Sequence, residues 1–552
     1  MHEELINALL PSSGHDAEHW ESLYPPRPLP EGAKVTRFAP SPTGFVHIGG
    51  VYVASISQSV AHASGGTYFI RIEDTDQARE VPDAGLQFER AFAHFGIESD
   101  ESADQVPWGP YLQSQRGEIY VTYVRQLLRS DTAYPCFCIP EQLEQTRDAQ
   151  REAKLATGYY GQWATCRTLS EDDVAARLAA GARPVIRLRT PDPIDHRVTF
   201  TDAIRGDIEQ LDNFNDAVVL KSGILNSGIL NSGEPRTPTY HFAHAVDDHL
   251  MRVNLVIRGE EWISSVPLHL QLFAALGFDP PAYAHIAPLM KLDGSSRRKL
   301  SKRNDPEASV DFYIAEGYPA AAVHHYLRGL ANAHLSDLPI AEAASAPIDL
   351  DRCGVAGPLV DLAKLDDVAK NVVAEMPIDD IYDALVAWQR QFDEALARAA
   401  VAEPDRVKAA FAIGRGSDRQ RKDVGKWSEF RSVFGFLLDS VFEPVRDPSD
   451  ERFGGLPPDV VQAVAVDFAE NFRPESDPAV WFEQIRKLAT LHRFALNKAE
   501  LRDHPDDYVG LLKDAAGVIR VLLTGSTRSP ELDVIAGILG PDEVSRRVRA
   551  VT

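Results

Sequence analysis

Two short segments, far apart in the chain, carry residue types that could activate a nucleotide. The first runs from Arg37 to Gly50 and ends in His47-Ile-Gly-Gly50, and the second is Lys299-Leu-Ser-Lys-Arg303. A histidine and two glycines at a helix start suit a phosphate, because unpaired N–H groups and the helix dipole attract anions and glycine permits close approach to the backbone. Two nearby lysines can hold the β- and γ-phosphates. Together the segments predict an ATP site.

The residues around the first segment predict the elements that must position it. Residues 35–39 form a short apolar run that can end a strand, and a loop rich in proline and glycine follows. Residues 48–63 are compatible with a helix, and residues 67–72 with a second strand. This strand–helix–strand order favours a Rossmann-like nucleotide-binding domain.

Further segments make a family resemblance specific. The two motifs above resemble the signature motifs of class I aminoacyl-tRNA synthetases. Four more blocks resemble the bacterial glutamyl-tRNA synthetases in the same order: Arg71-Ile-Glu-Asp-Thr-Asp76, Pro238-Thr-Tyr-His-Phe-Ala243, Val246-Asp-Asp-His-Leu-Met251 and Val256-Ile-Arg-Gly-Glu-Glu-Trp262. Six blocks in one order are hard to obtain by chance, and the resemblance extends from residue 35 onward.

The resemblance implies an α/β fold, with a class I synthetase Rossmann-like nucleotide-binding domain, an α+β insertion and an all-α C-terminal anticodon-binding region. Apolar residues also recur at helical spacing over residues 320–327 and 362–370. The expected parts are an N-terminal extension (1–33), the two catalytic halves (34–113 and 237–310), an acceptor-end-binding insertion (114–236), a stem-contact region (311–385) and a helical anticodon-binding domain (386–552).

The resemblance also implies the reaction and its residues. The carboxylate of L-glutamate attacks the α-phosphate of ATP, which carries Mg²⁺, and the glutamyl group then passes to the 3′ end of tRNA(Glu). Positioning and charge stabilisation dominate such chemistry, with His47 and Lys302 as the expected catalytic residues. The expected ATP-binding residues are His47, Gly49, Gly50, Glu261, Trp262, Lys299, Ser301 and Lys302. The expected glutamate-binding residues are Arg37, Ala39, Ser41, Glu73, Tyr240 and Arg258.

Glutamate itself explains the types of residue in the second set. Two carboxylates call for arginines, whose planar fork pairs with carboxylate oxygens, and an ammonium calls for an anion. We therefore expect Glu73 to bind the α-ammonium, while Arg37, Tyr240 and Arg258 donate hydrogen bonds. A local ion pair of Glu73 with Arg71 or Arg79 is the simpler alternative.

Three other functions are alternatives to glutamate–tRNA ligation. Glutaminyl-tRNA synthetases typically have Pro-Glu-Pro-Asn-Gly where this chain has Pro40-Ser-Pro-Thr-Gly44. Truncated relatives that glutamylate a tRNA base lack an anticodon domain, whereas this chain continues to residue 552. A non-catalytic tRNA-binding homologue would fail in ATP–pyrophosphate exchange. The sequence leaves open whether tRNA(Gln) is also charged.

Composition is compatible with this interpretation. The chain has 552 residues, 44% hydrophobic and 25% charged, which is typical of a protein with several domains. The absence of a long apolar run predicts no membrane span, and four cysteines favour the reducing cytoplasm. We expect a monomer.

The net charge of −24 is unusual for an RNA binder. A local cluster is either a tRNA-contacting surface or a solvated loop: Arg415, Arg419, Arg421, Lys422 and Lys426.

Three cysteines raise the question of a metal. Cys136, Cys138 and Cys166, with Tyr159 and Tyr160 between them, resemble the zinc-bearing insertion of some glutamyl-tRNA synthetases. A structural zinc site normally has four Cys or His ligands, and tyrosine would be an unusual fourth. The sequence therefore does not decide whether these cysteines bind zinc, and we predict buried free thiols without a metal.

A tandem repeat precedes Tyr240. Ser222-Gly-Ile-Leu-Asn226 is followed directly by Ser227-Gly-Ile-Leu-Asn231 and then by Ser232-Gly233. Its Gly, Ser and Asn content is typical of turns. We interpret it as a tolerated duplication in a surface loop rather than a functional element.

Overall fold

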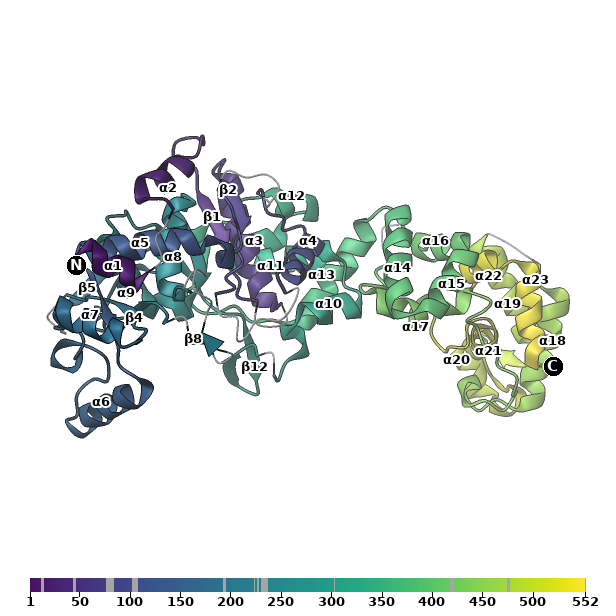
Figure 1. Cartoon of the computed structure of the whole chain (residues 1–552). Helices are drawn as coiled ribbons and strands as arrows, with labels where there is room; N and C mark the ends of the chain where they lie inside the picture. The colour runs from purple at the N-terminus through teal and green to yellow at the C-terminus, as the bar shows by residue number, and fades with distance from the viewer. Residues whose placement is uncertain are drawn as a thin grey trace. The chain divides into compact units, whose positions relative to one another are not determined.

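The chain forms two compact units in the computed structural model (Figure 1). One comprises Met1–Phe312 and His324–Asp361, and the other Tyr313–Val323 and Leu362–Thr552. The described residues are 1–10, 14–42, 46–75, 84–101, 108–191, 195–222, 224–225, 228–229, 237–301, 303–416, 421–473 and 477–551. Lys302, Arg79 and Arg419, which the sequence analysis singled out, lie outside them.

The first unit contains the predicted strand–helix–strand element. β1 (Val35–Phe38) and β2 (Thr67–Ile70) pair in parallel, and α3 (Ile48–Ala63) connects them. Parallel strands need such a crossover, and α3 supplies it with a largely buried apolar face. The predicted strand, helix and strand are confirmed, although the second strand ends two residues earlier than expected.

The second catalytic half lies beside the first. β10 (Leu255–Gly259) and β11 (Ala282–Ile286) are parallel, and α9 (Val266–Leu276) lies between them in sequence. Asn254 ties this half to β1, because Val35 donates its N–H to Asn254 Oδ1 at 2.8 Å and Asn254 donates its own N–H to Val35 O at 3.2 Å. Two segments separated by 219 residues therefore meet at the start of the strands β1 and β10.

A hairpin from the predicted insertion extends this sheet. β5 (Arg197–Asp202) and β6 (Gly206–Leu211) are antiparallel, and the strand order is β10-β11-β5-β6. β5 meets β11 in parallel at the pair Tyr283 and Asp202. The described part of the segment also contains an antiparallel sheet and two helices, which give it an α+β character: β3 (Ala133–Cys136), β4 (Val185–Leu188), β7 (Val218–Leu220), α6 (Pro140–Glu152) and α7 (Glu171–Ala179).

The N-terminal extension is packed. α1 (Glu3–Leu9) and α2 (Ala17–Leu23) bury Ile6, Leu9 and Trp20 in one core with α5 (Gly117–Arg129) and α8 (Tyr240–Leu250). The other α-helices and strands among the described residues up to 345 are α4 (Ala84–His94), the short antiparallel pair β8 (Ile224–Leu225) and β9 (Gly228–Ile229), the hairpin β12 (Met290–Asp293) and β13 (Ser296–Lys299), and the helices α10 (Val310–Glu316), α11 (Ala320–Ala331) and α12 (Ile340–Ser345).

The second unit is helical around an apolar core that includes Trp427, Phe430 and Leu522. Its helices are α13 (Leu362–Glu375), α14 (Ile378–Phe392), α15 (Glu394–Ala402), α16 (Pro404–Ala412), α17 (Phe430–Phe434), α18 (Pro458–Asn471), α19 (Pro478–Leu491), α20 (Lys498–Asp503), α21 (Leu512–Thr524), α22 (Leu532–Leu539) and α23 (Pro541–Val548). A two-residue parallel pair, β14 (Phe494–Ala495) and β15 (Gly510–Leu511), departs from the all-α prediction. Among the described helices, none has the length and apolar composition needed to cross a membrane.

Candidate active site

One cavity in the first unit, of about 590 Å³, brings together most of the residues that the sequence analysis assigned to ATP and glutamate. The predicted residues that line it are Arg37, Ala39, Ser41, His47, Gly49, Gly50, Glu73, Tyr240, Arg258, Glu261, Trp262 and Lys299. Ser301 is not among the lining residues. Other residues of the lining were not predicted from the sequence, including Tyr52, Lys221 and Ile286.

His47 begins α3 and has a defined tautomer. The backbone N–H of Gly49 donates to His47 Nδ1 at 2.8 Å, so in the neutral ring the proton is on Nε2. A Cβ on residue 49 would lie 2.9 Å from this Nδ1 atom, closer than side chains tolerate. Glycine at position 49 therefore permits the cap, and the cap makes Nε2 a hydrogen-bond donor.

The second motif begins at Lys299, the last residue of the hairpin β12–β13, and Asp305 binds residues of the hairpin and the motif. Ser301 donates its backbone N–H to Asp305 Oδ2 at 2.9 Å, and Arg298 pairs with both carboxylate oxygens at 2.6 and 2.7 Å. These contacts hold the pKa of Asp305 well below its usual range, with the Arg298 hydrogen bonds as the main cause. Lys299 Nζ lies 3.8 Å from Glu261 Oε1 across the cavity lining.

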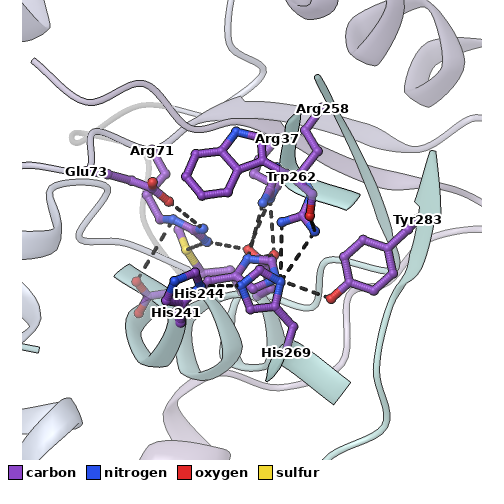
Figure 2. Close-up of polar contacts among 12 residues, drawn as sticks. Arg37, Arg71, Glu73, His241, His244, Arg258, Trp262, His269 and Tyr283 are labelled. Carbon is purple, nitrogen blue, oxygen red and sulfur yellow. Dashed lines mark hydrogen bonds and ion pairs between the residues drawn. The ribbon is translucent and has the colours of Figure 1, made fainter. Parts of the chain in front are cut away.

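Arg37 is buried at the end of β1 and paired with Asp248 on α8. Its Nε donates to both Asp248 oxygens, at 3.1 and 3.2 Å (Figure 2). Asp248 also accepts from Arg71 Nη1 at 2.6 Å and lies 2.9 Å from His244 Nδ1. This buried carboxylate thus holds two arginines together beneath the cavity, and opposing charges compensate for their burial.

Glu73 contributes a buried carboxyl group to the cavity lining. It is 5% exposed, accepts from Arg71 Nη2 at 3.2 Å and lines the cavity. Burial raises the pKa of Glu73 to about 7, although Arg71 and Arg37 oppose the shift. The ion pair with Arg71 that was the alternative interpretation does form, and it leaves Glu73 in the cavity lining.

Arg258 and Tyr240 provide donors from the other side of the cavity. The Arg258 guanidinium lies 4.9 Å from the centre of the Tyr283 ring (Figure 2). The centre of the Tyr240 ring lies 4.6 Å from that of Trp262. Burial raises the pKa of Tyr240 to about 12, so its hydroxyl stays protonated at neutral pH and can donate. Ala39 and Ser41 contribute from the loop after β1.

Three histidines lie beneath these arginines and were not anticipated. His241 Nδ1 is 2.9 Å from His269 Nε2, and the rings of His244 and His269 are 4.3 Å apart (Figure 2). Burial lowers the pKa of both His241 and His244 to about 4, so they are neutral near pH 7. His244 and Asp248 follow Tyr240 at intervals of four residues, which is the spacing of one helix face. This spacing could have indicated His244 and Asp248 from the sequence.

The three cysteines also come together, apart from this cavity. Cys136, Cys138 and Cys166 place their sulfur atoms within 4.8 Å of one another. The hydroxyl of Tyr159 lies 3.2 Å from Cys138 Sγ, whereas Tyr160 donates its hydroxyl to Ala156 O at 2.6 Å. Of the two tyrosines in this segment, Tyr159 is therefore the one whose hydroxyl lies beside the cysteine sulfurs.

Comparison with known proteins decides the family. The family model described as tRNA synthetases class I (E and Q), catalytic domain, matches residues 34–365, and an anticodon binding domain matches residues 511–552. A glutamate–tRNA ligase of Clostridium perfringens (strain 13) is 37% identical, over 99% of this chain and 100% of that protein. That of Clostridium beijerinckii is 38% identical, over 99% and 98%. The chain belongs to the glutamate–tRNA ligase family.

Solved structures in this family share the fold. The glutamate tRNA ligase of Elizabethkingia meningosepticum, solved in complex with its amino acid, has a TM-score of 0.74 at 24% identity, covering 94% of this chain and 98% of that one. The glutamate-tRNA synthetase of Elizabethkingia anophelis has a TM-score of 0.73 at 25% identity, covering 94% and 99%. The predicted class I synthetase fold is confirmed. Glutamate–tRNA ligases are ATP-dependent enzymes, so the prediction of ATP as cosubstrate is confirmed at that level.

Proposed function

We propose that this chain attaches L-glutamate to the 3′ end of tRNA(Glu) at the expense of Mg²⁺–ATP, as a monomer in the cytoplasm. The observation that carries the proposal is that two buried arginines and a buried glutamate, Arg37, Arg258 and Glu73, line the same cavity as His47 and Lys299. The charges of such a pocket match an amino acid with two carboxylates and one ammonium.

Recognition of glutamate follows from these charges. Arg37 and Arg258 each pair with one carboxylate, with the Tyr240 hydroxyl as an additional donor. The α-ammonium binds Glu73, and its positive charge favours the ionised form of this carboxyl. Glutamine in the same pocket leaves an arginine without its anion, which is a costly arrangement in a buried site.

Activation needs positioning rather than a protein nucleophile. An oxygen of the glutamate α-carboxylate attacks the α-phosphorus of ATP, the bond to the bridging oxygen breaks, and pyrophosphate leaves. His47 Nε2–H donates to phosphate oxygens as negative charge develops, and Lys299 and Lys302 bind the leaving pyrophosphate. Gly49 and Gly50 allow the nucleotide to approach the start of α3. Glu261 and Trp262 complete the nucleotide side, and Ser301 supports the lysine segment.

Transfer completes the reaction. A ribose hydroxyl at the tRNA 3′ end attacks the carbonyl carbon of glutamyl-adenylate, and AMP leaves. We assign residues 114–236 to the tRNA acceptor end, 311–385 to the stem and 386–552 to the anticodon, following the organisation of the family. The matched anticodon binding domain at residues 511–552 supports the last assignment.

The cysteine cluster fits a structural zinc ion, which supports the alternative that the sequence left open. Three thiol sulfurs within 4.8 Å of one another suit tetrahedral zinc, and the Tyr159 hydroxyl lies beside them. Phe137 donates its backbone N–H to Cys166 Sγ at 3.4 Å, as amides commonly do to thiolates. The ion would join the end of β3 to the loop that contains Cys166 and has no part in the reaction.

Aminoacylation with purified components tests the proposal. We expect glutamate, and not glutamine, to be attached to tRNA(Glu), with tRNA(Gln) assayed in parallel. By the behaviour of the family, pyrophosphate exchange should stay near background until tRNA is added. Charging of glutamine would favour a glutaminyl-tRNA synthetase, and tRNA binding without exchange or charging would favour a non-catalytic homologue.

A further inference from the structure

We propose that His285, held by Asp202, is a positioning residue that orients Arg258 toward a carboxylate of glutamate. The inference rests on the proposed role of Arg258 in binding glutamate. Neither His285 nor Asp202 lines the cavity, whereas Arg258 does. Both act through the arginine and not on the substrate.

Asp202 is a fixed acceptor at the end of β5. Its side chain is buried, and Oδ1 accepts the backbone N–H groups of Ile204 and Arg205, each at 3.0 Å. Oδ2 accepts the backbone N–H of His285 at 3.1 Å and lies 2.6 Å from His285 Nδ1. Four contacts therefore fix the Asp202 carboxylate. Because a carboxylate oxygen can only accept a hydrogen bond, His285 Nδ1 must carry the proton that is donated to it.

This contact determines what His285 presents to Arg258. With the proton on Nδ1, the neutral ring has a lone pair on Nε2, and Arg258 Nε donates to that atom at 3.1 Å. A second ring proton would turn Nε2 into a donor facing another donor. His285 is fully buried beside the Arg258 guanidinium, and both conditions favour the neutral ring.

Arg258 is consequently held at one end and directed at the other. Its Nε is engaged by His285, and its plane lies 4.9 Å from the Tyr283 ring centre. Nη1 and Nη2 lie 3.4 Å from His269 Nδ1 (Figure 2). Nη2 also lies 3.4 Å from the backbone oxygen of Trp262, a residue that lines the cavity. A flexible arginine loses several rotamers on binding a ligand, and one that is held in place beforehand avoids much of that loss.

The chain positions of the three residues make this assembly specific. Arg258 lies next to the last residue of β10, and His285 lies in β11. Asp202 joins the sheet from the β5–β6 hairpin through its pairing with Tyr283. The hairpin belongs to the segment predicted as the acceptor-end insertion. The insertion therefore supplies Asp202, the residue of the hydrogen-bonded series Asp202–His285–Arg258 that is most remote from the glutamate pocket.

Two amide substitutions separate positioning from packing. In His285→Asn the amide can still donate to Asp202 but does not reach Arg258, and in His285→Gln it reaches the former position of Nε2 and offers an acceptor. We expect His285→Asn to raise the KM for glutamate about tenfold, as for loss of a hydrogen bond to a charged group. The KM for ATP and kcat should change little. His285→Gln should recover most of the loss.

Asp202→Asn provides an independent variant. Its amide keeps an oxygen for Ile204 and Arg205 but presents N–H to His285 Nδ1, which moves the ring proton to Nε2 and opposes Arg258. The KM for glutamate should again rise. The matched control is His196→Gln on the same hairpin, because His196 forms an exposed pair with Asp212 at 3.0 Å. This variant should behave as wild type.

The outcomes are distinguishable. Equal losses of kcat and melting temperature in His285→Asn and His285→Gln, with an unchanged KM for glutamate, would mean that the histidine only packs the core. If Arg258→Ala impairs glutamate binding and neither His285→Asn nor Asp202→Asn does, the positioning role alone is wrong. If Arg258→Ala has no effect on the KM for glutamate, the assignment of Arg258 in the proposed function is wrong, and the positioning role is wrong with it.

Discussion

The ring of His47 accepts the backbone N–H of Gly49 through Nδ1, at 2.8 Å. The histidine therefore has two separable roles. It caps the start of α3, as Asn, Asp or Ser would, and it presents Nε2–H as a donor. Capping belongs to the fold, whereas donation from Nε2 belongs to the proposed chemistry, so a suitable substitution can remove one role and keep the other.

His47→Asn is that substitution. Asparagine is among the best capping residues, so the melting temperature should stay close to that of wild type. Its amide does not reach the position of Nε2, and a donor that acts on developing phosphate charge is lost. We expect kcat for pyrophosphate exchange in the presence of tRNA to fall about 100-fold or more, with small changes in KM.

His47→Ala provides the comparison, because it removes the cap as well. It should lose the same catalytic factor and some stability in addition. Wild-type turnover in His47→Asn would show that the histidine serves the helix alone.

Glu73 predicts a pH dependence of glutamate use. Its pKa of about 7 means that the carboxyl loses its charge as the pH falls below 7, and the α-ammonium then loses its partner. We expect kcat/KM for glutamate to be constant above pH 7 and to fall about tenfold per pH unit below it. The profile should be measured from pH 5.5 to 8.5. A break near pH 4.5, the ordinary value for glutamate side chains, would contradict the assignment.

The same carboxyl predicts a stability effect of opposite sign. Because its pKa is raised in the folded state, its contribution to stability is full below pH 4.5 and is lost as the pH rises through about 7. Glu73→Gln should therefore match wild type in melting temperature at pH 4.5 and exceed it at pH 8, while its glutamate KM is high and no longer depends on pH. Equal melting temperatures at pH 8 would show that burial does not disfavour this charge.

These residues differ in how far the sequence could predict them. His47, Lys299, Glu73 and Arg258 lie in short motifs whose residue types and order carry the information. The partners of those residues come from remote segments: Asp248 lies 211 residues from Arg37, and Asp202 lies 83 residues from His285. Such pairings depend on sheet order and on the joining of β5 to β11, which spacing along the chain does not encode.

The basic cluster illustrates the same limit. Arg415 donates to the backbone carbonyls of Phe411, Met376 and Val373, which satisfies helix ends. Arg421 pairs with Asp423 and Glu531, and Lys426 with Glu316 and Asp366. These side chains have partners within their own unit, so the structure adds no support for a tRNA-contacting surface. The sequence alone could not distinguish a paired arginine from one available to phosphate.

The cysteine cluster predicts one zinc ion per chain in protein purified without chelator. Elemental analysis should find it, and Cys166→Ser should lower both the zinc content and the melting temperature, because the ion would join the β3 end to its neighbouring loop. Cys353→Ser is the matched control. Cys353 is also a buried free cysteine, but it is remote from this cluster in the sequence and contacts Asn332. Zinc-free wild-type protein with unchanged stability would favour buried free thiols.

The tandem repeat is predicted to be dispensable. Ile224–Leu225 of the first copy pairs in antiparallel fashion with Gly228–Ile229 of the second, so the copies form a short hairpin. Deleting residues 227–231 leaves one copy and shortens the connection before α8, at a cost in loop closure well under about 1 kcal/mol. Charging kinetics and melting temperature should stay near wild type. A folded deletion variant that no longer charges tRNA would give the repeat a role.

The choice of glutamate over glutamine is expected to depend on Arg37. Its side chain is 3% exposed, its Nε donates to Asp248, and its Nη2 lies 3.4 Å from His244 Nδ1. We therefore expect a substrate carboxylate to pair with the outer nitrogens rather than with Nε. Arg37→Gln removes a buried positive charge that glutamate needs and glutamine does not. We expect kcat/KM for glutamate to fall far more than that for glutamine, so that the ratio between them narrows.

The measurement is kcat/KM for both amino acids, with saturating tRNA, in wild type and in Arg37→Gln. Arg258→Gln serves as the matched variant, because Arg258 is the other buried arginine of the cavity. If Arg258 binds the α-carboxylate, which both substrates have, this substitution should lower kcat/KM equally for glutamate and glutamine. A ratio that stays unchanged in Arg37→Gln but narrows in Arg258→Gln would exchange the two roles and make Arg258 the residue that binds the side-chain carboxylate.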